Sequence, residues 1–365
     1  MALFDSSDGL SRRRLMQLTV ALGVAGLGAP MLAACGDDGA PTTSTDAGAA
    51  PDPEAAKREG ALVVWHNDQE PDNVKLLAEF TKKTGIEAVQ QKIAPAEALT
   101  KLQLELRAGV SSVDVFLSSP DVHHQLQQQG ALLQYNSPDS GKYEPQYKSN
   151  PNGFWSAYFI NVTPMVYIPT DVPEAIAPKT YEDLLDPRWK SQIVFPPPTS
   201  ATGFNWWYML RDLLPKDYFD RLREQQPRSF PSSTAMLAEL SNGNKKIAGS
   251  MSVFAVTKAK RANEPLTFSA DARGIPTSLN SIALMKSSKR PNAAKMFADY
   301  LLSEEGQRFW NDMQGSYSAY PGIVVPELPD IKTLKLLTAT DFSTYGSPEL
   351  RKEFQDLWSR VVGLA

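Results

Sequence analysis

From residue 62 onward the chain alternates short apolar runs with amphipathic stretches, and this alternation limits the fold more than any other feature. Apolar runs lie at 62–65, 86–89 and 113–117, and amphipathic stretches lie between them at 73–84 and 96–108. Short apolar runs predict buried strands, and stretches with helical spacing of apolar residues predict helices. We therefore expect an α/β fold with a parallel sheet, helices on both faces, and ligands beyond the carboxyl ends of the strands.

The pattern starts again after Trp155, which predicts a second lobe. Thr180 precedes a short helix and is followed three residues later by a carboxylate, the arrangement of a capping box. The aromatic run at 206–208 begins a helix and favours packing inside this lobe over ligand stacking. The elements expected in this half are strands at 158–162, 165–168, 193–195 and 282–285 and helices at 204–214, 293–302 and 304–313.

A loop rich in small hydroxyl residues lies between the strand at 193–195 and the helix that follows it. It contains Thr199, Ser200 and Ala201. Hydroxyl groups and unpaired backbone N–H groups at the start of a helix bind carboxylate or phosphate-like oxyanions. The loop is therefore a candidate anion site, although such residues taken alone are more often ordinary turn and cap residues.

The N-terminus has the features of an export signal. Paired arginines at 12–14 precede an apolar run at 18–32, which is too short and too broken by glycine and proline for a stable membrane span. The segment resembles a twin-arginine signal, and Leu-Ala-Ala-Cys ending at Cys35 resembles a bacterial lipobox. We expect residues 1–34 to be removed and Cys35, the only cysteine, to be lipidated and to hold the protein on a membrane.

The composition after Cys35 separates a tether from a folded body. Residues 36–53 contain no large apolar side chain, so we expect 35–55 to be a flexible lipidated tether. The rest of the chain is long enough for more than one domain. With 37 Lys+Arg against 41 Asp+Glu, and without a basic block, the chain is not expected to bind nucleic acid.

Several segments, in their order and spacing, resemble one known family. The family is the extracellular solute-binding proteins of ABC importers, in particular the ferric-ion-binding branch, and the likeness covers nearly the whole mature chain. The segments are LLAEFTKKTGI at 76–86, TYEDLLDPRWK at 180–190, PTS at 198–200, and RPNAAK at 290–295 continuing to LLSEEGQ at 301–307.

The resemblance implies the two-lobe fold of the periplasmic binding proteins, of type II, with a hinge and a cleft between the lobes. We expect 56–157 with 277–322 to form lobe 1, and 158–276 with 323–365 to form lobe 2. It also implies a monomer in the periplasm or at the cell surface. Its partners would be a small-molecule ligand and the permease of an ABC transporter.

The residues that hold iron in the ferric-binding branch are missing here. In that branch two adjacent tyrosines follow a strand of the second lobe, and this chain has Val253 and Phe254 there. The family's histidine falls near Gln69 and its glutamate falls at Ser119. Ferric iron prefers phenolate and carboxylate oxygens, so we expect no bound metal and no cofactor.

The anion-binding half of that site is retained, which predicts a small organic anion as ligand: a carboxylate, phosphonate or phosphate ester. Apolar walls would come from Trp65 and Phe254, although Trp65 suits a core position equally well. The candidate ligand-binding residues are Trp65, Asn67, Gln69, Ser118, Ser119, Thr199, Ser200, Ala201, Ser232, Ser233 and Phe254.

An enzyme is not expected, because the sequence has no nucleophile elbow, no phosphate-binding glycine fingerprint and no zinc-protease motif. Two other ligands remain open. Chelated or unusually ligated iron would use Tyr317 and Tyr320, and a polyamine would need Asp68, Glu70 or Asp121 pointing into the cleft. His123 and His124 are adjacent on an expected helix, so their side chains should point apart rather than share a metal.

Overall fold

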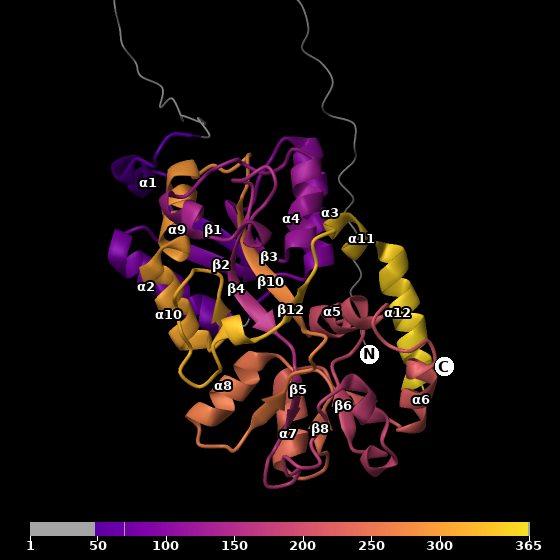
Figure 1. Cartoon of the computed structure of the whole chain (residues 1–365). Helices are drawn as coiled ribbons and strands as arrows, with labels where there is room; N and C mark the ends of the chain where they lie inside the picture. The colour runs from indigo at the N-terminus through magenta and orange to yellow at the C-terminus, as the bar shows by residue number, and fades with distance from the viewer. Residues whose placement is uncertain (1–47, 69, 364–365) are drawn as a thin grey trace, which may run out of the picture. The chain divides into compact units, whose positions relative to one another are not determined.

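The structure is a computed structural model that describes residues 48–68 and 70–363 (Figure 1). The expected signal at 1–34, the lipidation site Cys35 and the candidate residue Gln69 lie outside the described residues. Among the described helices, none combines the length and apolar character that crossing a membrane requires.

The first sheet has seven strands in the order β11, β4, β10, β3, β1, β2, with β12 paired to β10. Strands β1, β2 and β3 are parallel, whereas β10 runs antiparallel to both β3 and β4. The parallel arrangement expected from the sequence is therefore correct for β1 to β3, whereas the sheet as a whole is mixed, with antiparallel pairs at β10 and β4 and a further parallel pair between β10 and β12. The bounds are β1 Leu62–His66, β2 Ala88–Lys92, β3 Val115–Ser118, β4 Ser156–Val162, β10 Ile275–Leu284, β11 Tyr317–Ser318 and β12 Leu336–Thr338.

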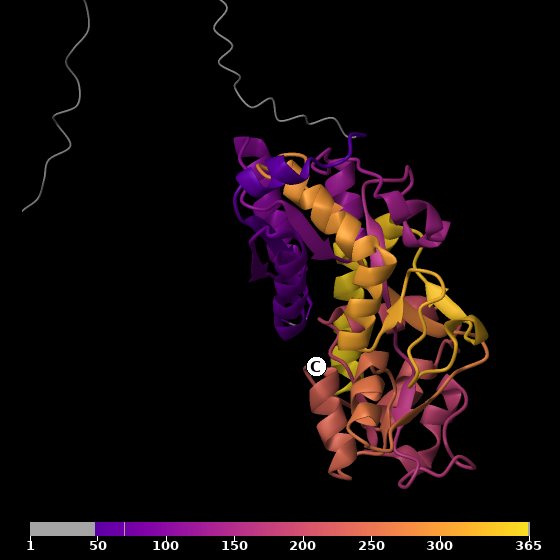
Figure 2. The same ribbon diagram turned by 90° about the vertical axis from the view of Figure 1, so that its left-hand side faces the viewer.

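Helices cover both faces of this sheet. On one face α10 lies against both α2 and α9 (Figures 1 and 2), and Phe80 of α2 meets Phe297 of α9 edge to face at 5.2 Å. On the other face α3 and α4 bury Leu102 and Leu126 in a separate cluster. Burying each such side chain stabilises the fold by about 1.5–3 kcal/mol. The helices are α1 Pro53–Arg58, α2 Glu70–Thr84, α3 Pro95–Ala108, α4 Pro120–Gln128, α9 Pro291–Leu302 and α10 Glu304–Gln314.

The second sheet has five strands in the order β7, β6, β8, β5, β9. Its core is rich in aromatic residues: Trp207 of α5 stacks on Phe354 of α12 at 5.1 Å, and Trp206 is almost fully buried. The aromatic run at 206–208 therefore packs the lobe, as expected. The strands are β5 Met165–Tyr167, β6 Ile193–Phe195, β7 Arg228–Ser229, β8 Ile247–Ala248 and β9 Thr267–Ser269; the helices are α5 Ala201–Leu210, α6 Tyr218–Glu224, α7 Ser233–Ser241, α8 Val253–Arg261, α11 Phe342–Tyr345 and α12 Pro348–Val361.

The chain passes between the two sheets at three places, and these differ from the expected lobe boundaries. All of β4 pairs with β10 in the first sheet, so the first passage comes after Val162 and not at 158. The second passage precedes β10. Thr163, in the first passage, donates its N–H and Oγ1 to the carbonyl of Pro276 at the start of β10, so the two passages lie side by side.

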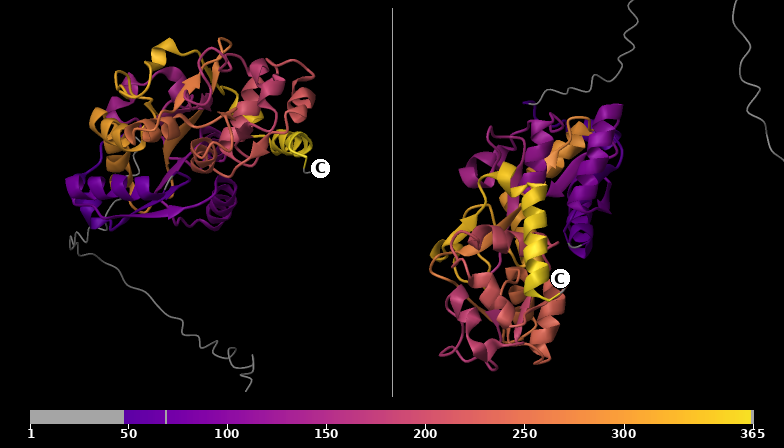
Figure 3. Two further views of the ribbon diagram at one scale, coloured as in Figure 1. Left: turned by 90° about the horizontal axis from the view of Figure 1, so that it is seen from below. Right: turned by 90° about the vertical axis from the view of Figure 1, so that its right-hand side faces the viewer.

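The third passage divides the C-terminal segment that we expected to belong wholly to lobe 2. Strand β12 pairs with β10 in the first sheet and α11 packs on α4, whereas α12 packs on α5 and α6 (Figures 1 and 3). The reason is the length of β10, which offers pairing positions to strands far apart in the sequence. We call the first sheet with α1 to α4 and α9 to α11 lobe 1, and the second sheet with α5 to α8 and α12 lobe 2.

Local signals in the sequence were accurate at several element ends. Gly109, a predicted helix stop, has a φ of 66° at the C-cap of α3. Thr180 and Asp183 form the predicted capping box. The tether expected up to residue 55 is shorter, however, because α1 begins at Pro53 and the N–H of Asp52 donates to Asn292 Oδ1 at 3.0 Å.

Candidate functional site

A small cavity, which we call the cleft pocket, lies where the two lobes meet beside β10. Its volume is about 50 Å³. Lobe 1 lines it with the loop after β1 and the start of α4, and lobe 2 lines it with α5 and α12. The polar positions relevant to ligand binding are Asn67, Ser119, Asp121, Asn205, Asn280 and Arg351.

Three of the candidate residues line this pocket: Asn67, Ser119 and Ala201. Ser119 is the N-cap of α4, and its side chain makes no capping hydrogen bond. Ala201 is the first residue of α5. The sequence thus identified one loop and two helix starts that the fold brings to the same cavity.

The start of α5 is stabilised by its N-cap residue, Ser200. Ser200 Oγ accepts from the N–H of Gly203 at 3.0 Å and donates to the carbonyl of Pro197 at 2.7 Å. A Cβ on Gly203 would lie 2.4 Å from that carbonyl, so only glycine lets the turn approach so closely. The Ser200 hydroxyl is therefore committed to the helix cap, and Thr202 carries the next hydroxyl of this segment.

A chain of polar side chains connects α5 to β4 and β10, the strands next to which the chain passes between the lobes and which we call the hinge strands. We call this chain the hydroxyl cluster: Asn161, Thr202, Ser233, Ser252 and Ser278. Ser252 Oγ accepts from Asn161 Nδ2 at 3.1 Å and lies 3.5 Å from Thr202 Oγ1. Asn161 Nδ2 also reaches Ser278 Oγ at 3.4 Å, and the N–H of Ser252 donates to Ser233 Oγ at 3.4 Å. Of these five, only Ser233 was among the candidates from sequence.

The hydroxyl cluster joins the N-terminal ends of two helices. Ser252 is the N-cap of α8 and Thr202 lies in the first turn of α5. The first N–H groups of a helix have no partner within it and carry partial positive charge. The arrangement can therefore hold an anion by hydroxyl groups and backbone N–H groups together.

Trp65 and Ser118 do not line the cleft pocket. Trp65 is 1% exposed, meets Phe116 edge to face at 6.5 Å, and has Lys101 Nζ 4.3 Å above its ring. Ser118 is fully buried, and its carbonyl accepts from Ser281 Oγ. Both side chains point to the face of the first sheet that α3 and α4 cover, because alternate strand residues face opposite ways.

The remaining candidates of lobe 2 lie outside the cleft pocket as well. Thr199 is exposed, and Ser232 caps α7 by accepting from the N–H of Ala235 at 3.1 Å. Phe254 is half-buried on α8 with Lys258 Nζ 5.6 Å from its ring centre. In this structure these side chains serve as surface, cap and helix contact.

Four polar atoms of the cleft pocket are buried and have no hydrogen-bond partner in the described chain. They are Oδ1 of Asn67, Oδ1 of Asp121, and both Oδ1 and Nδ2 of Asn205. Asn205 is only 1% exposed. An unpaired buried polar group costs about 1–3 kcal/mol, so such a concentration marks a place where another molecule completes the bonding.

Asp121 and Arg351 form an ion pair that joins the lobes. Arg351 Nη2 on α12 donates to Asp121 Oδ2 on α4 at 3.1 Å, and the Asp121 side chain is 4% exposed. The guanidinium also lies 4.3 Å from the ring centre of Phe204 and 5.7 Å from that of Tyr345. No sequence motif marked Arg351, because its partner lies 230 residues away.

Asp68, next to Asn67, is turned away from the pocket. It accepts hydrogen bonds from Tyr158 and from Asn280, and its side chain is buried. Burial raises the pKa of Asp68 to about 7, against the opposing effect of these two bonds, and the nearby Asp72 raises it further. Asp68 is thus a structural partner of the hinge strand and not a free anionic contact.

The groups considered for metal binding have other partners. Tyr317 donates to the carbonyl of Pro329 at 3.0 Å, and Tyr320 accepts from Lys142 at 2.7 Å. His123 and His124 are hydrogen-bonded to Ser281 and Ser343 respectively, so they point apart as predicted. Within 48–68 and 70–363, no group of three His, Cys, Asp or Glu side chains is placed to hold a metal ion.

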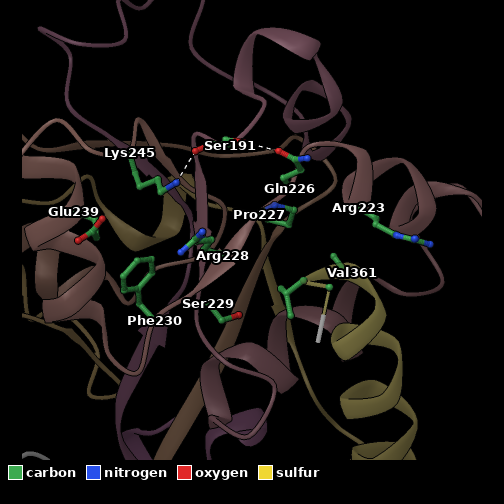
Figure 4. A pocket seen from close by; sticks show the side chains of 12 residues that line it. Ser191, Arg223, Gln226, Pro227, Arg228, Ser229, Phe230, Glu239, Lys245 and Val361 are labelled. Atoms are coloured by element: carbon green, nitrogen blue, oxygen red, sulfur yellow. Dashed lines mark hydrogen bonds between the residues drawn. The ribbon is translucent and has the colours of Figure 1, made fainter. Parts of the chain in front are cut away.

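A much larger cavity, of about 900 Å³, lies in lobe 2 between α6, β7, α7 and the end of α12 (Figure 4). We call it the basic groove, after Arg223, Arg228 and Lys245. Lys245 Nζ donates to the carbonyl of Ser191 at 2.6 Å, and Figure 4 shows Lys245 and Arg228 extending toward the same part of the groove. No lining side chain of this groove has a buried polar atom without a partner.

Comparisons with known proteins identify related sequences and folds. Residues 111–344 match the sequence profile of a family described as bacterial extracellular solute-binding protein. An uncharacterised protein of Haemophilus influenzae is 28% identical over 197 residues, covering 52% of this chain and 56% of the relative. The chain thus spans little more than half the length of that relative.

Solved structures share the fold across most of the chain. The iron-bound HitA structure from Pseudomonas aeruginosa superposes with a TM-score of 0.70 at 22% identity, covering 83% of this chain and 99% of that one. AfuA from Actinobacillus pleuropneumoniae, with fructose-6-phosphate bound, gives a TM-score of 0.68 at 21% identity, covering 84% and 99%. These likenesses confirm the expected two-lobe periplasmic-binding-protein fold.

Proposed function

Because this chain belongs to the bacterial extracellular solute-binding proteins, we propose that it captures a small organic anion between its lobes and delivers it to the permease of an ABC importer. The anion is a carboxylate, phosphonate or phosphate ester. The observation that carries this proposal is the hydroxyl cluster at the N-terminal ends of α5 and α8.

The chemistry of the cluster favours an anion over a cation. Thr202 and Ser252 contribute hydroxyl donors, and the first turns of α5 and α8 contribute N–H groups with partial positive charge. Asp68 is bonded to Tyr158, and Asp121 is paired with Arg351. Glu70 is exposed at the start of α2 and does not line the pocket. None of the three carboxylates that a polyamine would need therefore offers an unbalanced negative charge in the pocket.

Binding between the lobes explains how the ligand is signalled to a permease. The hydroxyl cluster belongs to lobe 2 and the hinge strands, while Asn67 and Ser119 belong to lobe 1. A ligand that contacts both sides stabilises the closed arrangement over the open one by the difference in its contacts. We infer that the permease recognises the closed arrangement.

We also propose that the protein is exported and held at a membrane through Cys35. The twin-arginine pattern and the lipobox residues support this location. Mass spectrometry of the mature protein tests it: a diacylated N-terminal Cys35 is expected. A chain that retains residues 1–34 in the cell envelope would contradict it.

Iron remains the second candidate, because HitA is a structurally similar protein solved with iron bound. Here Val253 and Phe254 occupy the positions of the paired tyrosines expected from the family, and neither offers an oxygen ligand. An iron-binding form of this chain would therefore need a chelator that supplies most of the oxygens.

Isothermal calorimetry of the chain from residue 36 tests the proposal with three probes: glycerol 3-phosphate, ferric citrate and putrescine. We expect the phosphate ester to bind, ferric citrate to bind no more tightly than citrate alone, and putrescine not to bind. Ser252→Ala should weaken binding of the phosphate ester about tenfold or more by removing a hydroxyl donor. Ser232→Ala is the matched control, since Ser232 caps α7 outside the pocket. Binding of ferric citrate or putrescine without any anion affinity would overturn the proposal.

A further inference from the structure

We infer that the ligand is a hydroxylated anion, whose hydroxyl groups enter the cleft pocket and bond to Asn67, Asp121 and Asn205 while its acidic group occupies the hydroxyl cluster. The inference rests on the proposed function and names the chemical class of its ligand. It starts from the four polar atoms of the pocket that are buried and unpaired in the described chain.

The position of Asn205 links the two parts of the site. It follows Ala201 by four residues on α5, so both lie on the same helix face and both line the pocket. Thr202, one residue after Ala201, contacts Ser252 in the hydroxyl cluster. A ligand whose acidic group meets the start of α5 therefore extends along this helix toward the Asn205 amide.

The unpaired atoms select hydroxyl groups over other ligand groups. Asn205 presents both an acceptor and a donor, and a hydroxyl group both donates and accepts. A ketone or ether oxygen cannot donate to Oδ1 of Asn205, and an ammonium group cannot accept from Nδ2. An alkyl group would leave every one of these atoms without a partner.

Charge in the pocket leads to the same conclusion. Among the residues that line the pocket, one carboxylate has an unpaired oxygen, that of Asp121, and Arg351 already neutralises it through Oδ2 at 3.1 Å. The other unpaired atoms belong to the neutral amides of Asn67 and Asn205. A pocket with no net charge and several acceptors favours neutral donors, which are hydroxyl groups, over an ammonium group.

The cavity also limits the size of the hydroxylated part. A volume of about 50 Å³ accommodates roughly three to five groups the size of water, since each needs about 10–15 Å³ by the same kind of measure. A short chain with two hydroxyl groups fits, whereas a long alkyl or aromatic tail does not.

Three phosphate esters with the same carbon chain length separate these possibilities in calorimetry: glycerol 3-phosphate, n-propyl phosphate and 3-aminopropyl phosphate. The wild-type chain should bind glycerol 3-phosphate about tenfold or more tightly than either analogue, because a site built for hydroxyl groups leaves its polar atoms unpaired with the others. Equal affinity for glycerol 3-phosphate and propyl phosphate would overturn the inference, as would a preference for the amine.

Substitution of Asn205 shows whether this residue forms hydrogen bonds with the hydroxyl groups of the ligand. Asn205→Leu keeps the volume and loses no internal hydrogen bond, so the variant should fold with an unchanged or higher Tm. It should lose the preference for glycerol 3-phosphate while retaining the affinity for propyl phosphate. Asn244→Leu, at an exposed position of lobe 2, is the matched control and should keep the preference.

Asn67→Ala provides a second variant that does not depend on a buried substitution, because Asn67 lies in a half-exposed loop. It should reduce the preference for glycerol 3-phosphate severalfold, and a full preference in both variants would contradict the inference. Failure of the proposed function is a distinct result: none of the three phosphate esters would then bind, and Ser252→Ala would change nothing.

Discussion

The cleft pocket and the basic groove differ in volume and in whether the polar side chains that line them have hydrogen-bond partners. The groove is the larger, at about 900 Å³ against about 50 Å³. Its cations are half-buried or exposed, and Lys245 already donates to Ser191. The cleft pocket contains the fully buried Asn205 amide with neither of its polar atoms paired. Unmet hydrogen bonding, and not volume, is therefore our reason for proposing the cleft pocket as the ligand site.

The two cavities also differ in which parts of the molecule they join. The groove lies entirely within lobe 2, between α6, β7, α7 and α12. The cleft pocket takes residues from both lobes and from the hinge strand β10. Occupying the groove cannot bring the lobes together, whereas occupying the cleft pocket can.

The largest expected difference between the cavities concerns filling them. Ala201→Trp places a large side chain in the cleft pocket and should weaken anion binding by a factor on the order of a thousand, since the ligand loses its space. Arg223→Trp places the same bulk at the basic groove and should leave affinity unchanged. Calorimetry with glycerol 3-phosphate measures both, and the reverse pattern would move the ligand site to the groove.

The next effect concerns pH and Asp68. The folded protein holds a proton on Asp68 up to about pH 7, while the unfolded chain releases it near about pH 4. The contribution of Asp68 to the free energy of unfolding therefore falls as pH rises from about 4 to 7, by on the order of 3 kcal/mol. Denaturant unfolding of Asp68→Asn and wild type across this range should show the variant gaining relative stability with pH.

The test for Asp68 is the difference in the free energy of unfolding between Asp68→Asn and wild type, because other groups also change the stability of both proteins with pH. Burial lowers the pKa of His123 to about 3, so His123 makes the folded state more stable as pH rises through the same range. Lys245→Met, in the basic groove, is the control and should parallel wild type between pH 4 and 7. A difference between Asp68→Asn and wild type that does not change with pH would show that Asp68 is ionised throughout.

A smaller effect is expected from the ion pair between the lobes. Arg351→Met keeps most of the packing on Phe204 but leaves the buried Asp121 without its cation, which should lower the free energy of unfolding by about 2 kcal/mol. The unbalanced carboxylate should also shift the ligand preference toward 3-aminopropyl phosphate. Urea denaturation and calorimetry check the two results, and an unchanged preference would separate Arg351 from ligand selection.

The smallest effect is expected in the basic groove. Burial and the charge of Arg228 lower the pKa of Lys245, so Arg228→Gln should relieve a repulsion and raise the free energy of unfolding by no more than about 0.5 kcal/mol. Anion affinity should stay at the wild-type value. A marked loss of anion affinity in this variant would show that the groove takes part in binding. The cleft pocket would then not be the whole ligand site.

Sequence patterns predicted the elements better than their pairing. The apolar run at 193–195 coincides with β6, and the run at 158–162 lies within β4. What the patterns could not give is that β4 joins the first sheet, because strand partners are set by contacts between distant residues. The run at 282–285 likewise revealed only the end of β10, since four of the five residues at 277–281 are polar.

The candidate site shows the same division. Asn67, Ser119 and Ala201 were found because they follow strands or start helices, which are recognisable locally. Asn205 and Arg351 were missed because one lies inside a helix and the other in a charged segment, where Asn and Arg have many ordinary roles. Trp65 was misleading in the opposite sense, since an aromatic residue at a strand end suits a core and a binding wall equally well.

The sequence by itself determined the class of protein: alternating elements, helix caps and segments in the order of one family are all local patterns. Only the tertiary structure decided which polar groups remain unsatisfied. Whether a buried amide such as Asn205 finds a partner depends on side chains that other elements bring to it, here from α4, α12 and the loop after β1. The ligand selection that we propose therefore depends on how the lobes meet, and no single segment encodes it.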